Sequence, residues 1–235
     1  MGKFFNLDGP LFAVFQKIAD LFLLNVAFLI CCIPIFTIGP ATSALYAVTM
    51  EMIRKENNNL FKSYFGYFKK YFPQSFIVEI IFIFVGAFLY FDYCVFGTLG
   101  QAGQLLQYVI LVSAIYYLFA LMYVFCVIPV FDNRVKNALR NAFVLPYVHL
   151  PWTLLTFAFQ SVLLYASLHN PDTFFRYWII PWICIGFAFV AYISSFMYYR
   201  AFMRYFPEWE EEYQKDLEEL HQETTRNDIK NGHSK

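Results

Sequence analysis

Long apolar runs alternate with short polar links along the chain. The first run starts at Leu21 and contains a single polar residue, Asn25, before Ile33. It is long enough to cross a hydrocarbon core, which takes about 20 residues of helix. Four further runs have the length and polarity of membrane spans, namely 76–96, 105–131, 147–168 and 177–199. The pattern predicts an all-α, polytopic transmembrane helical bundle with five spans.

A predicted turn follows the first run, because Pro34, Gly39 and Pro40 come together there. Glycine tolerates unusual backbone dihedrals, and proline cannot continue the hydrogen bonds of a preceding helical turn. Residues 41–53 then have a helical pattern again, which predicts a short return arm and a sixth span. The two arms would form a helical hairpin.

The hairpin places polar residues at matching depths. With the turn centred on residues 38 and 39, Asn25 and Glu51 both lie roughly 20 Å from it, at a rise of 1.5 Å per residue. We expect them to face each other, with Asp20 as a further candidate for this intramembrane polar contact. Such a contact either lines a solute path, because buried ionisable groups are costly, or only holds the hairpin together. We favour the structural role, and for Asp20 a pairing with Lys17 at the interface.

Basic residues concentrate in two links and after the last span. In the link 54–73, four phenylalanines recur at helical spacing with the lysines off their stripe, which predicts a helix that lies in the interface or docks a cytoplasmic partner. The link 132–146 predicts a second interfacial amphipathic helix. Basic links stay cytoplasmic, so the C-terminus is expected inside and, with six spans, the N-terminus also. The predicted interfacial basic residues are Lys62, Lys69, Lys70, Arg134, Lys136, Arg140, Arg200 and Arg204.

The end of the chain differs from the rest, because residues 208–235 hold nine acidic and four basic residues. We therefore predict a transmembrane domain over 1–207 and a cytoplasmic acidic tail over 208–235, disordered from residue 224. The first part of the tail is amphipathic, and its apolar stripe either folds back on the basic links or is offered to a partner. That stripe consists of Trp209, Tyr213, Leu217 and Leu220.

Composition supports a membrane protein, since 60% of the residues are hydrophobic and only 14% are charged. The sequence holds no phosphate-binding loop, dinucleotide fingerprint, zinc-protease motif or nucleophile elbow. Its four histidines are not at metal-ligand spacing, and its five cysteines lie inside apolar runs. We therefore expect no enzymatic activity, no catalytic residues, no cofactor, no metal site and no nucleic-acid partner.

Three motifs carry a resemblance to a known family: GKFFNLDGP at the start, CCIPIFTIGPATSALY at the predicted turn, and VFDNRVKNALRNAF in the second basic link. Together they resemble the YesL-like family of bacterial integral membrane proteins, a domain of unknown function, over the chain up to about residue 207. The resemblance implies a small multi-pass protein of the bacterial cell membrane, often encoded beside carbohydrate-importing ABC transporters. It supplies no catalytic or ligand residues.

The function expected from this resemblance is that of a non-enzymatic accessory or assembly partner of a carbohydrate ABC importer. Its partners would be the lipid bilayer and the permease subunits of the importer. The alternative is a stand-alone transporter or channel for a small solute, with Asn25 and Glu51 along the path.

Overall fold

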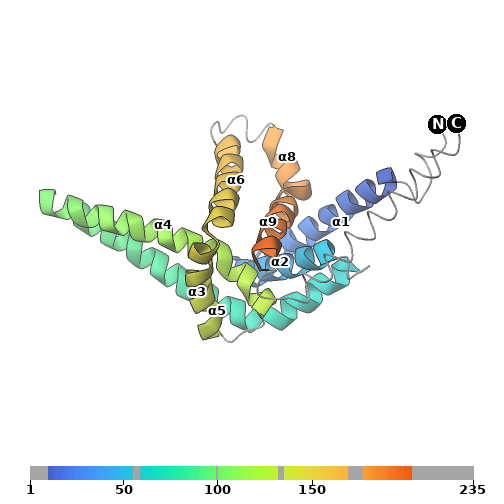
Figure 1. Cartoon of the computed structure of the whole chain (residues 1–235), viewed down its shortest axis with the longest axis horizontal. Helices are drawn as coiled ribbons and strands as arrows, with labels where there is room; N and C mark the ends of the chain where they lie inside the picture. The colour runs from blue at the N-terminus through green and yellow to red at the C-terminus, as the bar shows by residue number, and fades with distance from the viewer. Residues whose placement is uncertain (1–9, 55–58, 99, 132–134, 169–176, 203–235) are drawn as a thin grey trace, which may run out of the picture. The chain divides into compact units, whose positions relative to one another are not determined.

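The computed structural model describes residues 10–54, 59–98, 100–131, 135–168 and 177–202. Every regular element within these ranges is helical (Figure 1). Contacts divide the chain into two units, residues 1–196 and 197–235, and the fold described below is that of the first unit. The elements are α1 (Pro10–Cys31), η1 (Ile35–Thr37), α2 (Ile38–Arg54), α3 (Leu60–Gly97), α4 (Gly100–Phe131), α5 (Val135–Val148), α6 (Leu150–Leu168), α8 (Ile179–Pro181), η3 (Trp182–Gly186) and α9 (Phe187–Phe202).

Five helical segments in the described part of the chain are long and apolar enough to cross a membrane. Each overlaps one of the five predicted spans, so the chain is a multi-pass membrane protein built from helices. The predicted sixth span corresponds to α2, which has 17 residues and is not among the five. Its crossing of the membrane stays a prediction. The five segments are Val14–Cys31, Leu60–Gly97, Gly103–Phe131, Leu150–Ser167 and Ile179–Phe202.

The turn between α1 and α2 is shifted from its predicted centre. It occupies the residues after Cys31 and includes Pro34, whose backbone is extended with φ −77° and ψ 121°. The Thr37 hydroxyl closes the turn by donating to the carbonyl oxygens of Cys31 and Pro34, at 2.5 and 2.6 Å. Pro34 therefore lies in the turn, as predicted.

Gly39 and Pro40 lie in the first turn of α2, so their predicted place in the connection is wrong. A proline is tolerated there because the first N–H groups of a helix have no intrahelical acceptor. Gly39 is required for close packing, since a Cβ at this position would lie 2.7 Å from a ring carbon of Phe125 and 3.0 Å from Glu79. The small residues after the turn thus bring α2 against α3 and α4.

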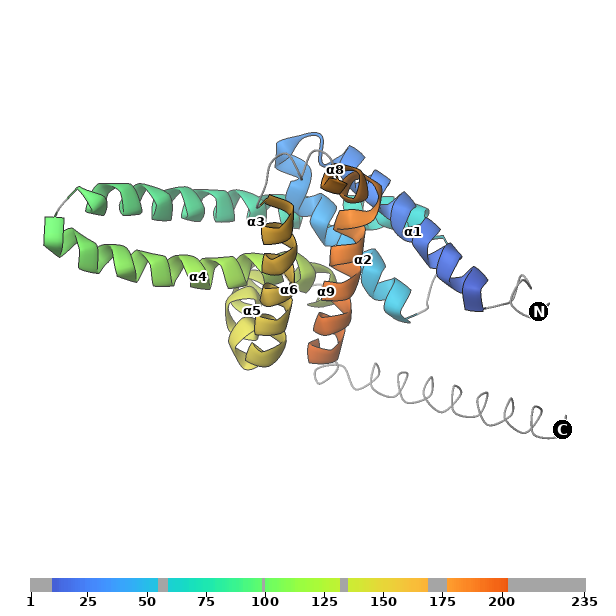
Figure 2. The same cartoon turned by 90° about the horizontal axis from the view of Figure 1, so that it is seen from above.

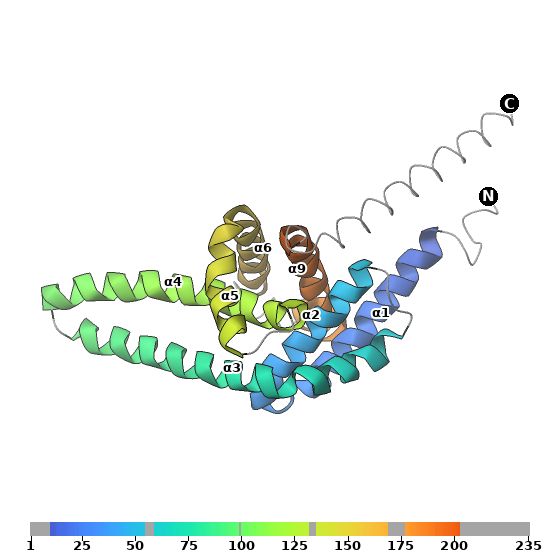
Figure 3. The same ribbon diagram turned by 60° about the horizontal axis from the view of Figure 1, so that its bottom comes forward.

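Helix α2 is the most enclosed element of the unit. Between Gly39 and Met50 only Thr42 is not buried. The helix contacts α1, α3 and α4, and Figure 3 shows it beside α1 and across α3. Ser75 of α3 donates to the Ser43 hydroxyl of α2 at 2.8 Å, which adds a polar contact to this packing.

Helix α3 is continuous over 38 residues, so the predicted interfacial helix and the following span are one helix. Pro73 removes one backbone hydrogen bond, but packing on both sides of it maintains the helix. The buried stripe of this helix is separate from the phenylalanine stripe, which is predicted to face the membrane interface or a partner. It consists of Leu60, Tyr64, Tyr71, Ser75, Val78, Glu79 and Phe82, whereas Phe61 is 50% exposed.

Helix α5 has the predicted apolar face, and that face packs on α3 and α4. Its buried residues Ala138 and Ala142 join Val78, Val124 and Ile128 in the main apolar core. In Figures 1 and 2, α3 and α4 run side by side away from this core to the tip where they are joined.

Candidate functional site

Asn25 of α1 is the centre of a buried contact with a widened stretch of helix. The segment η3 is a π-helix between α8 and α9, and such turns are frequent at functional sites. The Asn25 amide nitrogen donates to the carbonyl oxygens of Trp182 and Ile183, at 3.1 and 2.7 Å. Its side-chain oxygen accepts from the backbone N–H of Ala188 at 2.9 Å. A fully buried side chain therefore satisfies backbone groups at the start of the π turn and just after its end.

Polar side chains of α2, α6 and α9 form further hydrogen bonds among themselves. Thr49 and Ser195 share a hydrogen bond of 2.7 Å between their hydroxyl oxygens. Gln160 donates its amide N–H to the Ser194 hydroxyl at 3.1 Å, and Tyr46 hydrogen-bonds with both of these residues. We call this set the polar cluster; it consists of Asn25, Tyr46, Thr49, Gln160, Ser194 and Ser195.

A cavity of about 400 Å³ adjoins the polar cluster. Its walls come from α1, α2, α6 and the α8–η3–α9 helix, and most of its lining is apolar. The indole of Trp182 forms part of the wall and is fixed by donating its N–H to the Ser167 hydroxyl at 2.9 Å. A Cβ at Gly186 would lie 2.6 Å from this indole, so only glycine permits its position.

The predicted contact between Asn25 and Glu51 is wrong. Asn25 bonds to η3 and α9, whereas Glu51 accepts a hydrogen bond from the Tyr67 hydroxyl of α3. The cause is geometric, because the turn lies earlier than assumed and the two side chains leave their helices in different directions. Asp20 is half-buried on α1 and takes no part in the hydrogen bonds of Asn25. Lys17 stacks on the Tyr192 ring, with its ammonium 5.2 Å from the ring centroid.

A second candidate region is the outer half of the α3–α4 pair. We call it the α3–α4 arm and define it as residues 83–97 of α3 and 104–118 of α4. No residue of the arm is buried. Large apolar side chains are exposed along both helices, with Phe84 at 72% and Val112 at 67%. Such a surface suits either lipid or the membrane helices of a partner.

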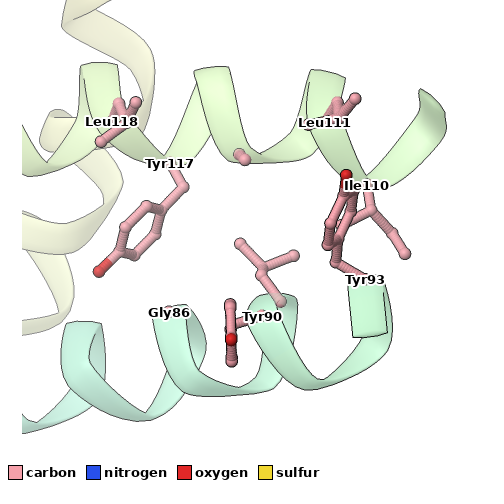
Figure 4. A pocket seen from close by; sticks show the side chains of 9 residues that line it. Gly86, Tyr90, Tyr93, Ile110, Leu111, Tyr117 and Leu118 are labelled. Atoms are coloured by element: carbon pink, nitrogen blue, oxygen red, sulfur yellow. The ribbon is translucent and has the colours of Figure 1, made fainter. Parts of the chain in front are cut away.

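A cleft of about 290 Å³ lies between the two helices of the arm (Figure 4). At its base the Tyr117 hydroxyl donates to the Phe82 carbonyl oxygen at 2.9 Å, and near the tip the Gln107 amide donates to the Tyr93 carbonyl oxygen at 3.1 Å. Gly86 permits the first bond, because a Cβ there would lie 2.8 Å from the Tyr117 hydroxyl. One hydrogen bond at each end of the apolar cleft thus joins α4 to α3.

Glu79 lies in the middle of α3 and is 8% exposed. Its carboxylate accepts a hydrogen bond from the backbone N–H of Gly39, at the start of α2. A carboxylate is stabilised at the N-terminus of a helix by the unpaired N–H groups and the helix dipole. Within the described residues, the second oxygen of Glu79 has no hydrogen-bond partner. We assign Glu79 to the α2–α3 junction.

The predicted basic residues have varied surroundings. The ammonium of Lys70 lies 4.8 Å from the centroid of the Tyr71 ring and donates to the hydroxyl of that residue. Arg134, Arg204 and the four residues of the predicted tail stripe lie outside the described residues. The six predicted basic residues within the described part of the chain are exposed, namely Lys62, Lys69, Lys70, Lys136, Arg140 and Arg200.

Most residues of the polar cluster were not predicted from the sequence. Gln160 and the pair of serines in α9 stand inside apolar spans, and their only signal is that polar side chains are uncommon there. Among the described residues, no group of three or more histidine, cysteine, aspartate or glutamate side chains could hold a metal ion.

Comparison with known proteins gives two matches. Residues 21–93 match the family described as protein of unknown function, DUF624. The uncharacterized protein YteU of Bacillus subtilis (strain 168) is 24% identical over 138 residues, which are 58% of this chain and 62% of that protein. The aligned region thus falls short of two thirds of that relative. No solved structure matches the chain. The two matches confirm the predicted resemblance to the YesL-like family.

Proposed function

We propose that this chain is a non-enzymatic membrane protein that docks on the permease subunits of a carbohydrate ABC importer through the α3–α4 arm. The observation that carries this proposal is the arm itself, which is built from two membrane helices with no buried residue in their outer halves. The C-terminus lies in the cytoplasm in this proposal, because the basic links are retained there.

Helix docking inside a membrane relies on close packing, since lipid tails are as apolar as leucine side chains. Small residues permit such packing, and the cleft of the arm contains Gly86 and Ala114. A neighbouring helix can therefore insert large side chains between α3 and α4. The resemblance to the YesL-like family supplies the class of partner, because members of that family are often encoded beside carbohydrate importers.

The test is purification from the native membrane through a C-terminal tag in mild detergent, followed by mass spectrometry. We expect permease subunits in near-stoichiometric amounts. Ala114→Trp fills the cleft and should lower their recovery about tenfold, since overpacking an interface by 1–3 kcal/mol has an effect of this order. Val162→Trp is the control, because Val162 is exposed on α6 and lies outside the arm. Equal recovery from both variants would contradict docking at the cleft.

Removal of the residues after 207 tests whether the C-terminal tail contributes to docking. If the tail contributes to docking, its loss should reduce the recovery of permease subunits while the truncated chain still elutes as a single species. Unchanged recovery would restrict the interface to the membrane domain.

The second candidate function is a stand-alone transporter for a small solute. The observation that favours it is that α2 carries both Thr49 of the buried polar cluster and the half-buried carboxylate of Glu51. Glu51→Gln separates the two candidates. The glutamine carbonyl can still accept a hydrogen bond from Tyr67, so folding should be retained, whereas flux that depends on the charge should stop. Tyr67→Phe removes the same hydrogen bond without touching the charge and is the matched control. Full uptake in the Glu51→Gln variant would contradict a transport path through Glu51.

A further inference from the structure

We propose that the cavity between α1, α2, α6 and the α8–η3–α9 helix binds one acyl chain of a membrane lipid. The cavity measures about 400 Å³. Of its walls, α1, α6 and the α8–η3–α9 helix are long and apolar enough to cross a membrane. This volume lies in the range of small-ligand pockets. Its apolar walls include Phe28, Leu45, Leu163, Leu164, Trp182 and Phe187.

The polar side chains of the cavity wall already have hydrogen-bond partners, either other side chains or the backbone of their own helix. The Thr42 hydroxyl donates to the Ile38 carbonyl oxygen of its own helix at 2.7 Å. Gln160 donates to Ser194, and Tyr46 bonds to both residues of that pair. A hydrated solute would lose its water here without gaining equivalent hydrogen bonds, which is unfavourable. The chemistry of the wall therefore selects a hydrocarbon.

The cavity is formed in advance of binding. The three hydrogen bonds of Asn25 hold the π turn that carries Trp182, and the bond from the Trp182 indole to Ser167 fixes the ring. Phe187 packs on the other side, with ring centroids 5.0 Å from Trp182 and 5.4 Å from Phe28. A ligand thus enters without ordering these side chains, which lowers the free-energy cost of binding.

Shape favours an acyl chain over a helix of a partner protein. A helix with its side chains is a rigid rod at least about 10 Å in diameter. A narrow, flexible hydrocarbon chain adapts more easily to a cavity of about 400 Å³. The apolar side chains of Ile30, Leu164 and Ile183 beside the cavity are more than half exposed, so the surrounding bilayer supplies the chain.

The experiment uses the full-length protein in lipid nanodiscs that contain a phosphatidylglycerol with a diazirine in the middle of one acyl chain. After irradiation, labelled peptides are mapped by mass spectrometry. We expect the label to concentrate on Leu163, Trp182 and Phe187. Leu163→Trp fills the cavity and should lower labelling of Trp182 and Phe187 about tenfold, by the same overpacking argument. Val162→Trp should leave it unchanged, because Val162 is 66% exposed and does not line the cavity.

Labelling in proportion to surface exposure, or equal labelling in both tryptophan variants, would overturn the proposal. Ala191→Val serves if Leu163→Trp elutes as an aggregate, because it adds only two methyl groups to the wall; a clear decrease in labelling supports the site, and no decrease overturns it. The inference does not depend on the proposed function. Ala114→Trp in the arm should leave labelling of Trp182 and Phe187 unchanged even if it abolishes permease recovery.

Discussion

The polar cluster and the α3–α4 arm are both built from apolar membrane helices, but they use their few polar groups differently. In the cluster, side chains of α2, α6 and α9 bond to one another, and Asn25 of α1 bonds to the backbone of η3 and α9. In the arm, two side chains bond to the backbone of the adjacent helix, one at each end of the cleft. The cluster therefore joins helices that are distant in the sequence, whereas the arm joins only neighbours.

This difference shows where the bundle is held together and where it is open to lipid or to partners. Within a membrane, hydrogen bonds and close packing stabilise helix association, because burial of apolar surface gains little there. The cluster has both kinds of contact. The arm has close contact at Gly86 but leaves a cleft further along. Changes in the cluster should therefore affect stability most, and changes in the arm should affect binding most.

The largest expected effect on stability comes from Asn25→Leu. The variant leaves two carbonyl oxygens of the π turn and the N–H of Ala188 without their partner, which should lower the free energy of unfolding by about 2–4 kcal/mol. Thermal unfolding in detergent, followed by circular dichroism, measures the change. Gln16→Leu is the control, because Gln16 is exposed on the same helix. Equal decreases in the free energy of unfolding in both variants would contradict a special role of Asn25.

Alanine substitutions at two glycines of α3 should have smaller effects on the free energy of unfolding, and the two effects should have opposite signs. Gly86→Ala displaces the Tyr117 hydroxyl from the Phe82 carbonyl and should destabilise by about 1 kcal/mol. Gly66→Ala meets no atom within 4 Å and should stabilise by about 0.5–1 kcal/mol, because alanine favours helix. Both are measured by the same unfolding assay. A stabilising Gly86→Ala would show that the Tyr117 bond does not hold the base of the arm.

The smallest effect is the coupling between Thr49 and Ser195. A double-mutant cycle of Thr49→Val and Ser195→Ala should give a coupling energy of about 0.6 kcal/mol, the average for hydrogen bonds between membrane helices. A second cycle of Thr49→Val and Ser113→Ala should give a coupling near zero, because the Ser113 hydroxyl bonds within its own helix in the arm. Equal coupling energies in the two cycles would contradict the distinction between the cluster and the arm.

The spans were predictable from the sequence because length and polarity alone define a membrane helix. The direction in which a given side chain points from its helix could not be predicted in this way. In α3 the phenylalanines and the tyrosines both recur at helical spacing, and the two residue types are similar enough in polarity that periodicity cannot choose between them. The structure buries Tyr64 and Tyr71 and leaves Phe61 half exposed.

The polar contacts were the least predictable part. The pairing of Asn25 with Glu51 rested on equal distances from a turn, and a shift of a few residues in the turn removed it. The actual partners of Asn25 are backbone groups more than 150 residues later in the chain. Backbone groups have no residue-specific signal, so a π turn that needs an amide partner cannot be read from the sequence of η3.

The π turn also sets the angular phase of the helix that follows it. A π turn holds about one residue more than an α-helical turn, and one residue corresponds to a rotation of about 100°. Ser194 and Ser195 meet Gln160 and Thr49 only with this offset in place. Deletion of a single residue within 182–186 would restore a regular helix and rotate both serines away from their partners, so chain length in this short segment is as constrained as residue type.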